Sequence, residues 1–248
     1  RDAAPAEFPV KPLNRLLIAN RGEIAVRIAR TARRMGIATI AVCSDADRDS
    51  PHVAACDEFV AIGGRLPSES YLDADRIIAA ARTTGAQAIH PGYGFLSENA
   101  AFAAAVHAAG LIFVGPPAAA IDAMGDKARA RRRMAAAGIP VVPGYDGDTQ
   151  DEDVLVAEAA RIGFPVMLKS TGGGGGIGMR LIRAQDQLAD AFEAVQRLAR
   201  ANFKDAGIYL EKYVQQARHI EVQIFGDGRG QVIALGERDC SIQRRNQK

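Results

Sequence analysis

The stretch KSTGGGGGIGMR, residues 169–180, decides how the rest of the chain is interpreted. The apolar run 164–168 precedes it, its last two residues begin the segment MRLI (179–182), and each of these two segments predicts a short buried strand. Five consecutive glycines cannot pack a core, and glycine loses more backbone freedom on folding than any other residue. Successive N–H groups of such a turn form a concave anion site, and the Lys169 ammonium supplies a cation beside it. The stretch therefore predicts a phosphate-binding loop between two strands, in preference to a surface linker.

The flanks of this loop distinguish it from better-known phosphate loops. In a dinucleotide-binding loop a helix follows the last glycine, whereas here a strand is predicted. A Walker loop carries its lysine after the glycines, whereas Lys169 precedes them. A protein-kinase loop also lies between two strands, but no V-A-I-K, H-R-D or D-F-G sequence follows. What remains is a nucleotide-binding lid of another kind, with its lysine on the entering strand.

Composition limits the class of protein. The chain has 248 residues, 48% of them hydrophobic, which is enough to bury the core of one large or two medium domains. A formal net charge of +2 does not predict a nucleic-acid partner, and no apolar run approaches the roughly 18 residues of a membrane span. The three cysteines are dispersed and odd in number, and they form no zinc-site pattern. We therefore expect a reducing compartment, the cytoplasm, with the mitochondrial matrix as the alternative.

The N-terminal part alternates between strands and helices. Residues 1–12, rich in alanine and proline, predict a disordered lead-in. Strands are then expected at 16–19, 39–42, 60–62, 88–90 and 112–114, and helices from 24, from Asp73 to about Thr84, and at 100–109. This alternation predicts a Rossmann-like, doubly wound parallel sheet over residues 13–115. Such sheets bind ligands beyond the carboxyl ends of their strands, where residues 20–23 and 90–95 are expected.

In the first of these helices, Ile24, Ile28, Ala32 and Met35 are expected on the buried face, and Gly36 is expected to end the helix. Four arginines of a later helix, Arg129 and Arg131 to Arg133, are interpreted as its solvated face, with a phosphate or partner patch as the alternative.

After residue 115 the pattern changes. Residues 116–140 predict a helical linker whose Ala- and Arg-rich helix ends at Gly138. Residues 141–213 predict a lid unit with helices at 152–162 and 184–200, the glycine loop between two strands, and a strand at 208–210. Period-two alternation at 220–225 and 232–235 predicts an antiparallel hairpin that starts a third unit, 214–248.

Six motifs occur in the order seen in biotin carboxylases, which are members of the ATP-grasp superfamily, and the chain resembles that family from about residue 13 to residue 248. They are IANRGEIA (18–25), HPGYGFLSEN (90–99), MGDK (124–127), the glycine loop, RHIE (218–221) and ERDCS (237–241). The resemblance implies that the Rossmann-like domain is followed by the ATP-grasp lid and by the start of the C-terminal ATP-grasp subdomain.

The resemblance also implies a reaction. ATP phosphorylates bicarbonate, and the carboxyl group then passes to biotin on a carrier domain, as the first half-reaction of a biotin-dependent carboxylase. Bicarbonate is a poor electrophile, so conversion of one oxygen to phosphate makes its carbon reactive. Catalysis would consist mostly of positioning and charge stabilisation around the transferring phosphoryl group. The implied partners are the biotin carboxyl carrier domain and a carboxyltransferase module, and a homodimer is compatible with the family.

Matching motifs place ATP-binding roles on residues of this chain. Lys127 and Lys169 match the lysines that reach phosphates, and Gly174, Gly175 and Gly176 match backbone donors to phosphate oxygens. Without the motif, Lys127 would be an ordinary solvated lysine at a helix start.

The run Glu211-Lys212-Tyr213-Val214 matches the hinge whose backbone reads adenine; its alternative is an ordinary half-buried strand. Further nucleotide contacts are implied for His219, Gln243 and Asn246, and Lys248 matches the catalytic lysine that holds bicarbonate. Taken alone, His219 would be a satisfied structural histidine, which is how His52, His90 and His107 are interpreted.

Three departures leave the final carboxyl acceptor open. Ile177 replaces a basic residue, Asn246 stands where acyl-CoA carboxylases usually carry His, and Lys-Ser-Thr replaces the commoner Lys-Ala-Ser. These features resemble urea carboxylases, whereas MGDK resembles acyl-CoA carboxylases.

The resemblance to biotin carboxylases implies that the ligands of Mg²⁺, the general base and a bicarbonate-binding arginine lie beyond Lys248. We therefore assign no metal site within this chain and expect the chain alone to be inactive, since Glu237 and Asp239 are a weak metal signal. The alternatives are another ATP-grasp ligase, or a nucleotide-binding module without turnover.

Overall fold

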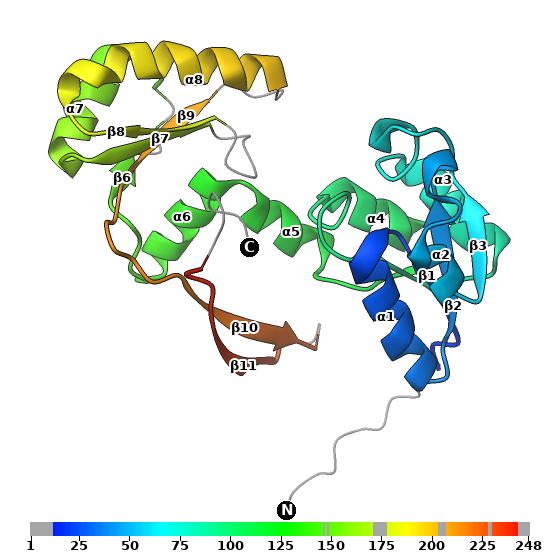
Figure 1. Ribbon diagram of the computed structural model, residues 1–248. Helices are drawn as coiled ribbons and strands as arrows, with labels where there is room; N and C mark the ends of the chain where they lie inside the picture. The colour runs from blue at the N-terminus through cyan, green and yellow to red at the C-terminus, as the bar shows by residue number, and fades with distance from the viewer. Residues whose placement is uncertain are drawn as a thin grey trace, which may run out of the picture. The chain divides into compact units, whose positions relative to one another are not determined.

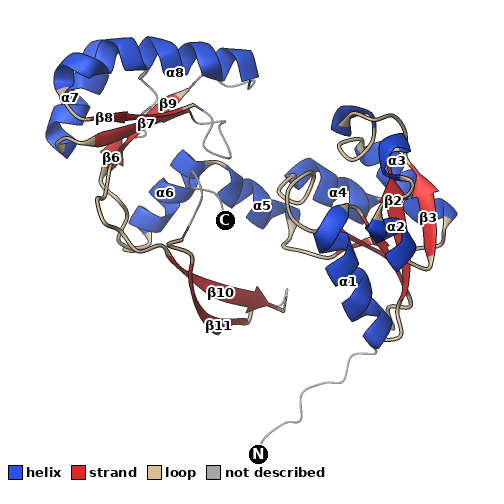
Figure 2. Cartoon of the chain, viewed as in Figure 1, coloured by secondary structure: helices blue, strands red, loops and turns tan. Residues whose placement is uncertain are grey.

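A computed structural model describes residues 12–145, 147, 149–170, 178–202, 207–227 and 230–242, with the side chains of Lys127 and of residues 201–202 left out. The chain divides into two compact units, the first ending at Asp122 and the second beginning at Ala123 (Figure 1). The predicted mixture of a parallel and an antiparallel sheet with helices is confirmed (Figure 2). None of the described helices combines the length and the apolar character that a membrane crossing needs.

A five-stranded parallel sheet forms the centre of the first unit, in the order β3-β2-β1-β4-β5. Its strands are β1 (Arg15–Ile18), β2 (Ala38–Cys43), β3 (Glu58–Ala61), β4 (Ala88–His90) and β5 (Ile112–Phe113). The central strand β1 pairs with β2 on one side and with β4 on the other. The chain runs outward from β1 to β3 and then returns to place β4 beside β1. The direction of winding therefore reverses between β1 and β4, which confirms the doubly wound prediction.

Helices cover both faces of this sheet, which explains why the strands β1 and β2 are buried along nearly their whole length, whereas the edge strand β3 is mostly exposed. They are α1 (Gly22–Arg34), α2 (Pro51–Ala55), α3 (Ala74–Thr83) and α4 (Ala100–Ala108). Leu16 and Ile18 of β1 are buried in the cluster that includes α1, with residues next to the end of α2 packed against it. Leu17 and Ala19 point the other way and are buried against α3 and α4.

Local signals set the ends of these helices. The Asp73 side chain accepts the Arg76 N–H at 3.0 Å, which confirms the predicted cap of α3. Gly36 has φ +73, a conformation that side chains rarely adopt, and it follows the end of α1 as predicted. The prediction that Met35 is buried was wrong, because α1 ends at Arg34; Met35 has left the helical period and is 68% exposed.

Two helices lie near the boundary of the units, α5 (Ala118–Gly125) and α6 (Lys127–Ala136). The sequence predicted α6, although to Gly138, and did not predict α5. Asp126 separates the two helices, and its carboxylate caps α6 by accepting the Arg129 N–H at 2.9 Å.

The second unit contains a four-stranded antiparallel sheet, here called the lid sheet, in the order β6-β9-β7-β8. Its strands are β6 (Gly144–Tyr145), β7 (Val166–Ser170), β8 (Met179–Ile182) and β9 (Ile208–Lys212). Helices α7 (Glu152–Ile162) and α8 (Leu188–Asn202) lie on one of its faces (Figure 1). The bounds of α7 are those predicted, whereas α8 begins four residues later than predicted because residues 185–187 form a 3₁₀ turn.

A separate hairpin consists of β10 (Ile220–Gly226) and β11 (Val232–Asp239), as predicted. A register shift between Gln223 and Ile224 marks a bulge, which period-two alternation alone does not predict.

Candidate functional site

The lid sheet presents one face to helices α7 and α8 and a second face that these helices do not cover. Val166, Leu168 and Leu210 are buried against the helices. Because successive side chains of a strand alternate between faces, Lys169 and Glu211 belong to the opposite face. We call this opposite face the open face of the lid sheet.

Apolar side chains make up most of the open face. Strand alternation and register place there the half-buried Met167, Met179 and Leu181, together with the buried Tyr209. Thioether and aliphatic groups with a few convergent polar atoms are typical of sites for flat organic ligands. The open face can therefore support a ring system next to the charged ends of Lys169 and Glu211.

Lys169 lies beside the last residue of β7, where the glycine run begins. Its ammonium donates to Glu211 Oε2, and the two side chains are 24% and 23% exposed. The same Nζ atom lies 5.8 Å from the centre of the Tyr209 ring. Burial, and then the charge of Glu211, raise the pKa of Tyr209 well above its ordinary value, so the phenol stays neutral.

Along the predicted hinge, residues 211–214, the backbone N–H groups lose their hydrogen bonds to the rest of the fold. The Lys212 N–H donates to the Pro143 carbonyl at 2.8 Å, and the Tyr213 N–H donates to the Pro165 carbonyl at 3.0 Å. Within the described residues, the Val214 N–H is the first along this run that donates to no protein acceptor, and its side chain is 52% exposed. Backbone hydrogen bonding along this run therefore extends one residue past the end of β9, to Tyr213.

The Lys212 side chain has a structural role. Its ammonium donates to the carbonyls of Gly163 and Phe164, at 2.7 and 2.9 Å, just after α7 ends. A cation at a helix C-terminus is favourable because the last carbonyls lack partners. Both the backbone N–H and the side chain of Lys212 are therefore engaged in the fold.

The predicted site also includes residues of the glycine loop and of the C-terminal segment. Gly174, Gly175, Gly176, Gln243, Asn246 and Lys248 lie outside the described residues, and so does Ile177. Lys127 is the first residue of α6, but its side chain is not described.

His219 is exposed and lies directly before β10. Its backbone N–H donates a hydrogen bond to Ser241 Oγ at 2.9 Å. Asp239 accepts from Ser241 and Arg218, and these hydrogen bonds hold its pKa far below the ordinary value. Among the described residues, no three His, Cys, Asp or Glu side chains gather in a way that could hold a metal ion.

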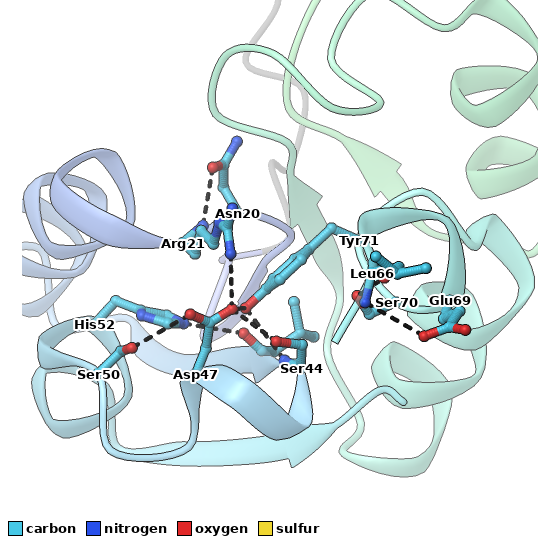
Figure 3. Close-up of polar contacts among 11 residues, drawn as sticks. Asn20, Arg21, Ser44, Asp47, Ser50, His52, Leu66, Glu69, Ser70 and Tyr71 are labelled. Atoms are coloured by element: carbon cyan, nitrogen blue, oxygen red, sulfur yellow. Dashed lines mark hydrogen bonds and ion pairs between the residues drawn. The ribbon is translucent and has the colours of Figure 1, made fainter. Parts of the chain in front are cut away.

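A second polar cluster lies in the first unit, at the carboxyl ends of β1, β2 and β4 (Figure 3). Asn20 is buried, and its amide nitrogen donates to the Pro91 and Tyr93 carbonyls at 2.7 and 2.8 Å. Gly92 has φ +66, and a Cβ atom there would lie 2.8 Å from the Asn20 amide nitrogen. Asn20 therefore ties the end of β1 to the loop after β4, and that loop requires a glycine.

Asp47 joins the same cluster from the segment after β2 (Figure 3). Its carboxylate accepts from Ser44 at 2.7 Å, Tyr71 at 2.8 Å and Arg21 at 3.0 Å. The Arg21 guanidinium lies 5.3 Å from the Tyr71 ring and 5.6 Å from the Phe95 ring, and the two rings stack. The sequence pattern did not single out Asp47 or Tyr71, although Asp47 lies in the polar segment that follows the carboxyl end of the buried strand β2, which was the available signal.

The loop after β4 contains two further polar contacts. The Gly92 N–H donates to His90 Nδ1 at 3.0 Å, and the Tyr93 hydroxyl donates to Glu23 at 2.5 Å. Burial, and then the charge of Arg27, lower the pKa of His90, so the neutral imidazole can accept this hydrogen bond. His52 is fully buried with Nε2 at 3.1 Å from the Val42 carbonyl, but its Nδ1 has no partner in the described part of the chain, so the prediction of a satisfied histidine holds for one nitrogen.

Two family descriptions match the chain in succession. "Biotin carboxylase, N-terminal domain" matches residues 12–121, and "Carbamoyl-phosphate synthase L chain, ATP binding domain" matches residues 126–248. Together they span nearly the whole chain and meet close to the boundary of the two compact units.

Curated relatives agree with these matches. The chain is 57% identical over 236 residues to the mitochondrial methylcrotonoyl-CoA carboxylase subunit alpha of Glycine max, covering 95% of this chain and 32% of the relative. It is 54% identical over 235 residues to the biotin carboxylase of a Nostoc species, covering 95% of this chain and 53% of the relative. The chain thus spans about a third to a half of the length of these relatives.

Solved structures are similar over nearly all of the chain. Biotin carboxylase from Campylobacter jejuni, solved as a β,γ-ATP complex, matches with a TM-score of 0.91 and 46% identity, over 96% of this chain and 53% of that one. The biotin carboxylase domain dimer of Hydrogenobacter thermophilus 2-oxoglutarate carboxylase, solved with MgADP and bicarbonate, matches with a TM-score of 0.89 and 46% identity, over 95% and 52%. With its two family matches and its doubly wound and lid sheets, the chain belongs to the biotin carboxylase family of ATP-grasp proteins.

Proposed function

We propose that the protein carrying this chain uses ATP and bicarbonate to carboxylate biotin on a carrier domain, and that this chain contributes its nucleotide-binding part. The observation that carries the proposal is the position of Lys169, at the end of β7 on the open face of the lid sheet and next to the glycine run. A lysine there places a cation beside the apolar side chains of the open face. A nucleoside triphosphate needs this combination, because its base is flat and apolar and its phosphates are negative.

The hinge supports a specific binding mode for the base. The Lys212 and Tyr213 N–H groups are engaged in the fold, whereas that of Val214 has no acceptor among the described residues. We propose that the Val214 N–H donates to a ring nitrogen of adenine and that a hinge carbonyl accepts from its amino group. The apolar side chains of Met179 and Leu181 would contact the face of the base.

The other roles rest on the motifs. Lys127, Lys169 and the N–H groups of Gly174, Gly175 and Gly176 would hold the phosphates, and His219, Gln243 and Asn246 would add contacts to the nucleotide. Lys248 would hold bicarbonate. When bound, ATP supplies the phosphoryl group that activates bicarbonate; the lysines and N–H groups orient its phosphates and offset their charge. Mg²⁺ is expected to assist, and the described residues offer no ligand set for it.

Likeness to acyl-CoA carboxylases leads us to propose an acyl-CoA as the final acceptor. The relatives at 57% and 52% identity are named for methylcrotonoyl-CoA and propionyl-CoA. The acceptor would bind a carboxyltransferase module, and a biotin carboxyl carrier domain would move between the two sites. The dimer named for the Hydrogenobacter domain supports a homodimer here. Both the cytoplasm and the mitochondrial matrix fit the relatives, several of which are named mitochondrial.

Titration calorimetry with ATP tests the nucleotide site. Replacing Lys169 by Met should weaken ATP binding by about 1.5–3 kcal/mol, the range for a hydrogen bond to a charged group. Arg180→Met is the matched control, because Arg180 lies exposed on β8 and by alternation on the opposite face of the same sheet. Unchanged ATP affinity in Lys169→Met, or an equal loss in Arg180→Met, would contradict the assignment.

A further inference from the structure

The lysine that we assign to the phosphates is already paired with a carboxylate. Lys169 and Glu211 lie on neighbouring strands of the lid sheet, with Lys169 opposite Tyr209 in the register and Glu211 two residues further along β9. The Lys169 ammonium donates to Glu211, and about three quarters of each side chain is shielded from water. In the nucleotide-free protein, the carboxylate of Glu211 therefore neutralises the positive charge of Lys169 on the open face.

Neither of the two nearby side chains, Tyr209 and Lys212, can replace a charge of the Lys169–Glu211 pair. Tyr209 contributes a neutral ring, because its phenol is held protonated by burial. The Lys212 ammonium is committed to the Gly163 and Phe164 carbonyls. Within the described part of the open face, Glu211 is thus the carboxylate in contact with Lys169, and Lys212 cannot take the place of Lys169 without losing two hydrogen bonds.

Two electrostatic effects of Glu211 on a bound polyphosphate have the same sign. Glu211 stabilises Lys169 in the nucleotide-free state, so part of that interaction is weakened when the ammonium turns to phosphate oxygens. The carboxylate also repels the negative phosphates directly, and this repulsion is stronger in a partly shielded site than in water. Both effects lower the affinity for nucleotide.

We propose that Glu211 acts as a built-in counter-ion that neutralises Lys169 in the nucleotide-free protein and limits the affinity for nucleotide, so that ADP leaves readily after phosphoryl transfer. This role rests on the proposed function of Lys169. Limited affinity is useful in an enzyme that must release ADP in every turnover, because product release often sets the turnover rate.

The test is calorimetric titration of ADP into the protein that carries this chain, unaltered and as Glu211→Gln. The amide keeps the shape and can still accept from Lys169, but it removes the charge. ADP should bind about three- to tenfold more tightly to Glu211→Gln, and its dissociation should slow by a similar factor, as expected for a half-buried charge pair. Glu158→Gln is the matched control, because Glu158 pairs with Arg161 on α7 and should leave ADP affinity unchanged.

Glu211→Asp keeps the charge on a side chain one methylene shorter, so its ADP affinity should stay nearer to that of the unaltered protein than to that of Glu211→Gln, which separates charge from packing. Should Glu211→Gln not fold, Lys169→Met with Glu211→Met is compared with Lys169→Met alone: loss of the carboxylate must still raise the affinity, because its repulsion of the phosphates does not need the lysine. Unchanged or weaker ADP binding in Glu211→Gln, or in that double variant, overturns the counter-ion role while leaving the nucleotide site intact. Absence of ADP binding by the unaltered protein overturns the proposed function, and the counter-ion role with it.

Discussion

Ser170, directly after Lys169, carries a hydroxyl that makes no hydrogen bond with the described residues. The residue is 2% exposed, its Oγ has no partner among those residues, and its backbone N–H donates to the Gly178 carbonyl at 3.1 Å. A buried polar group without a partner costs about 1–3 kcal/mol. The sequence revealed that serine stands where the family more often has alanine, but burial and the missing partner come from the paired strands.

Ser170→Ala should therefore stabilise the second unit by about 1 kcal/mol, measured as an increase in its unfolding free energy in denaturant. Ser44→Ala is the control, because the Ser44 hydroxyl donates to Asp47 and its loss should destabilise the first unit. A loss of stability in Ser170→Ala would show that the hydroxyl has a partner in solution.

Asp47 should make the first unit sensitive to acid. Burial raises the pKa of its carboxyl, but hydrogen bonds from Ser44, Tyr71 and Arg21 outweigh burial and hold the pKa below the ordinary 3.8. The charged form is thus favoured in the folded state, so its stabilisation is present above about pH 4 and is lost as the pH falls through the folded-state value.

Asp47→Asn should lower the unfolding free energy at pH 7 by about 1–3 kcal/mol and flatten its dependence on pH below 4. Asp186→Asn, at an exposed residue of the 3₁₀ turn before α8, provides the comparison. Equal acid sensitivity of Asp47→Asn and the unaltered chain would contradict the role given to this carboxylate.

Among elements, Asn20 connects the end of β1 to the loop after β4. Asn20→Ala would leave the Pro91 and Tyr93 carbonyls without their donor, and it should destabilise the first unit by about 1–3 kcal/mol. Amide hydrogen exchange in residues 92–95 should become faster. The exposed Asn14 serves as control, since Asn14→Ala should change stability by less than about 0.5 kcal/mol. Unchanged exchange in the loop would mean that other contacts hold it.

The elements themselves follow largely from sequence pattern. Continuous apolar runs predict β1, β2 and β4 because helices cover both faces of the sheet. Period 3.6 predicts α7 to the residue because Asp151 caps its start and Gly163 follows its end. Local pattern failed where tertiary contacts or turn geometry decide: α5 was missed, α8 starts late, and Met35 leaves its helix. The Lys169–Glu211 pair is likewise invisible to local pattern, because it depends on the register between β7 and β9.

For the whole molecule, the sequence predicted a Rossmann-like parallel sheet followed by a lid unit with a glycine loop between two strands. The structure contains the parallel sheet and, after it, an antiparallel sheet that includes these two strands. The finer division, with a linker at 116–140 and a third unit at 214–248, stays a prediction. Only the family motifs gave roles to Gln243, Asn246 and Lys248. These residues lie beyond the lid in the sequence, and no local pattern connects them with the glycine loop. Composition and periodicity alone could lead to a nucleotide-binding lid, but not to bicarbonate.

In the proposed reaction, the protein that carries this chain transfers the terminal phosphoryl group of ATP to bicarbonate, so its release of ADP should depend on bicarbonate. The most direct test measures ADP release by the protein that carries this chain, with MgATP and free biotin, in the presence and absence of bicarbonate. ADP release should require bicarbonate and should fall at least about tenfold in Lys169→Met at subsaturating ATP, in line with the binding energy assigned to Lys169. ADP release at the same rate without bicarbonate, or dependent instead on an amine or carboxylate acceptor, would contradict the account.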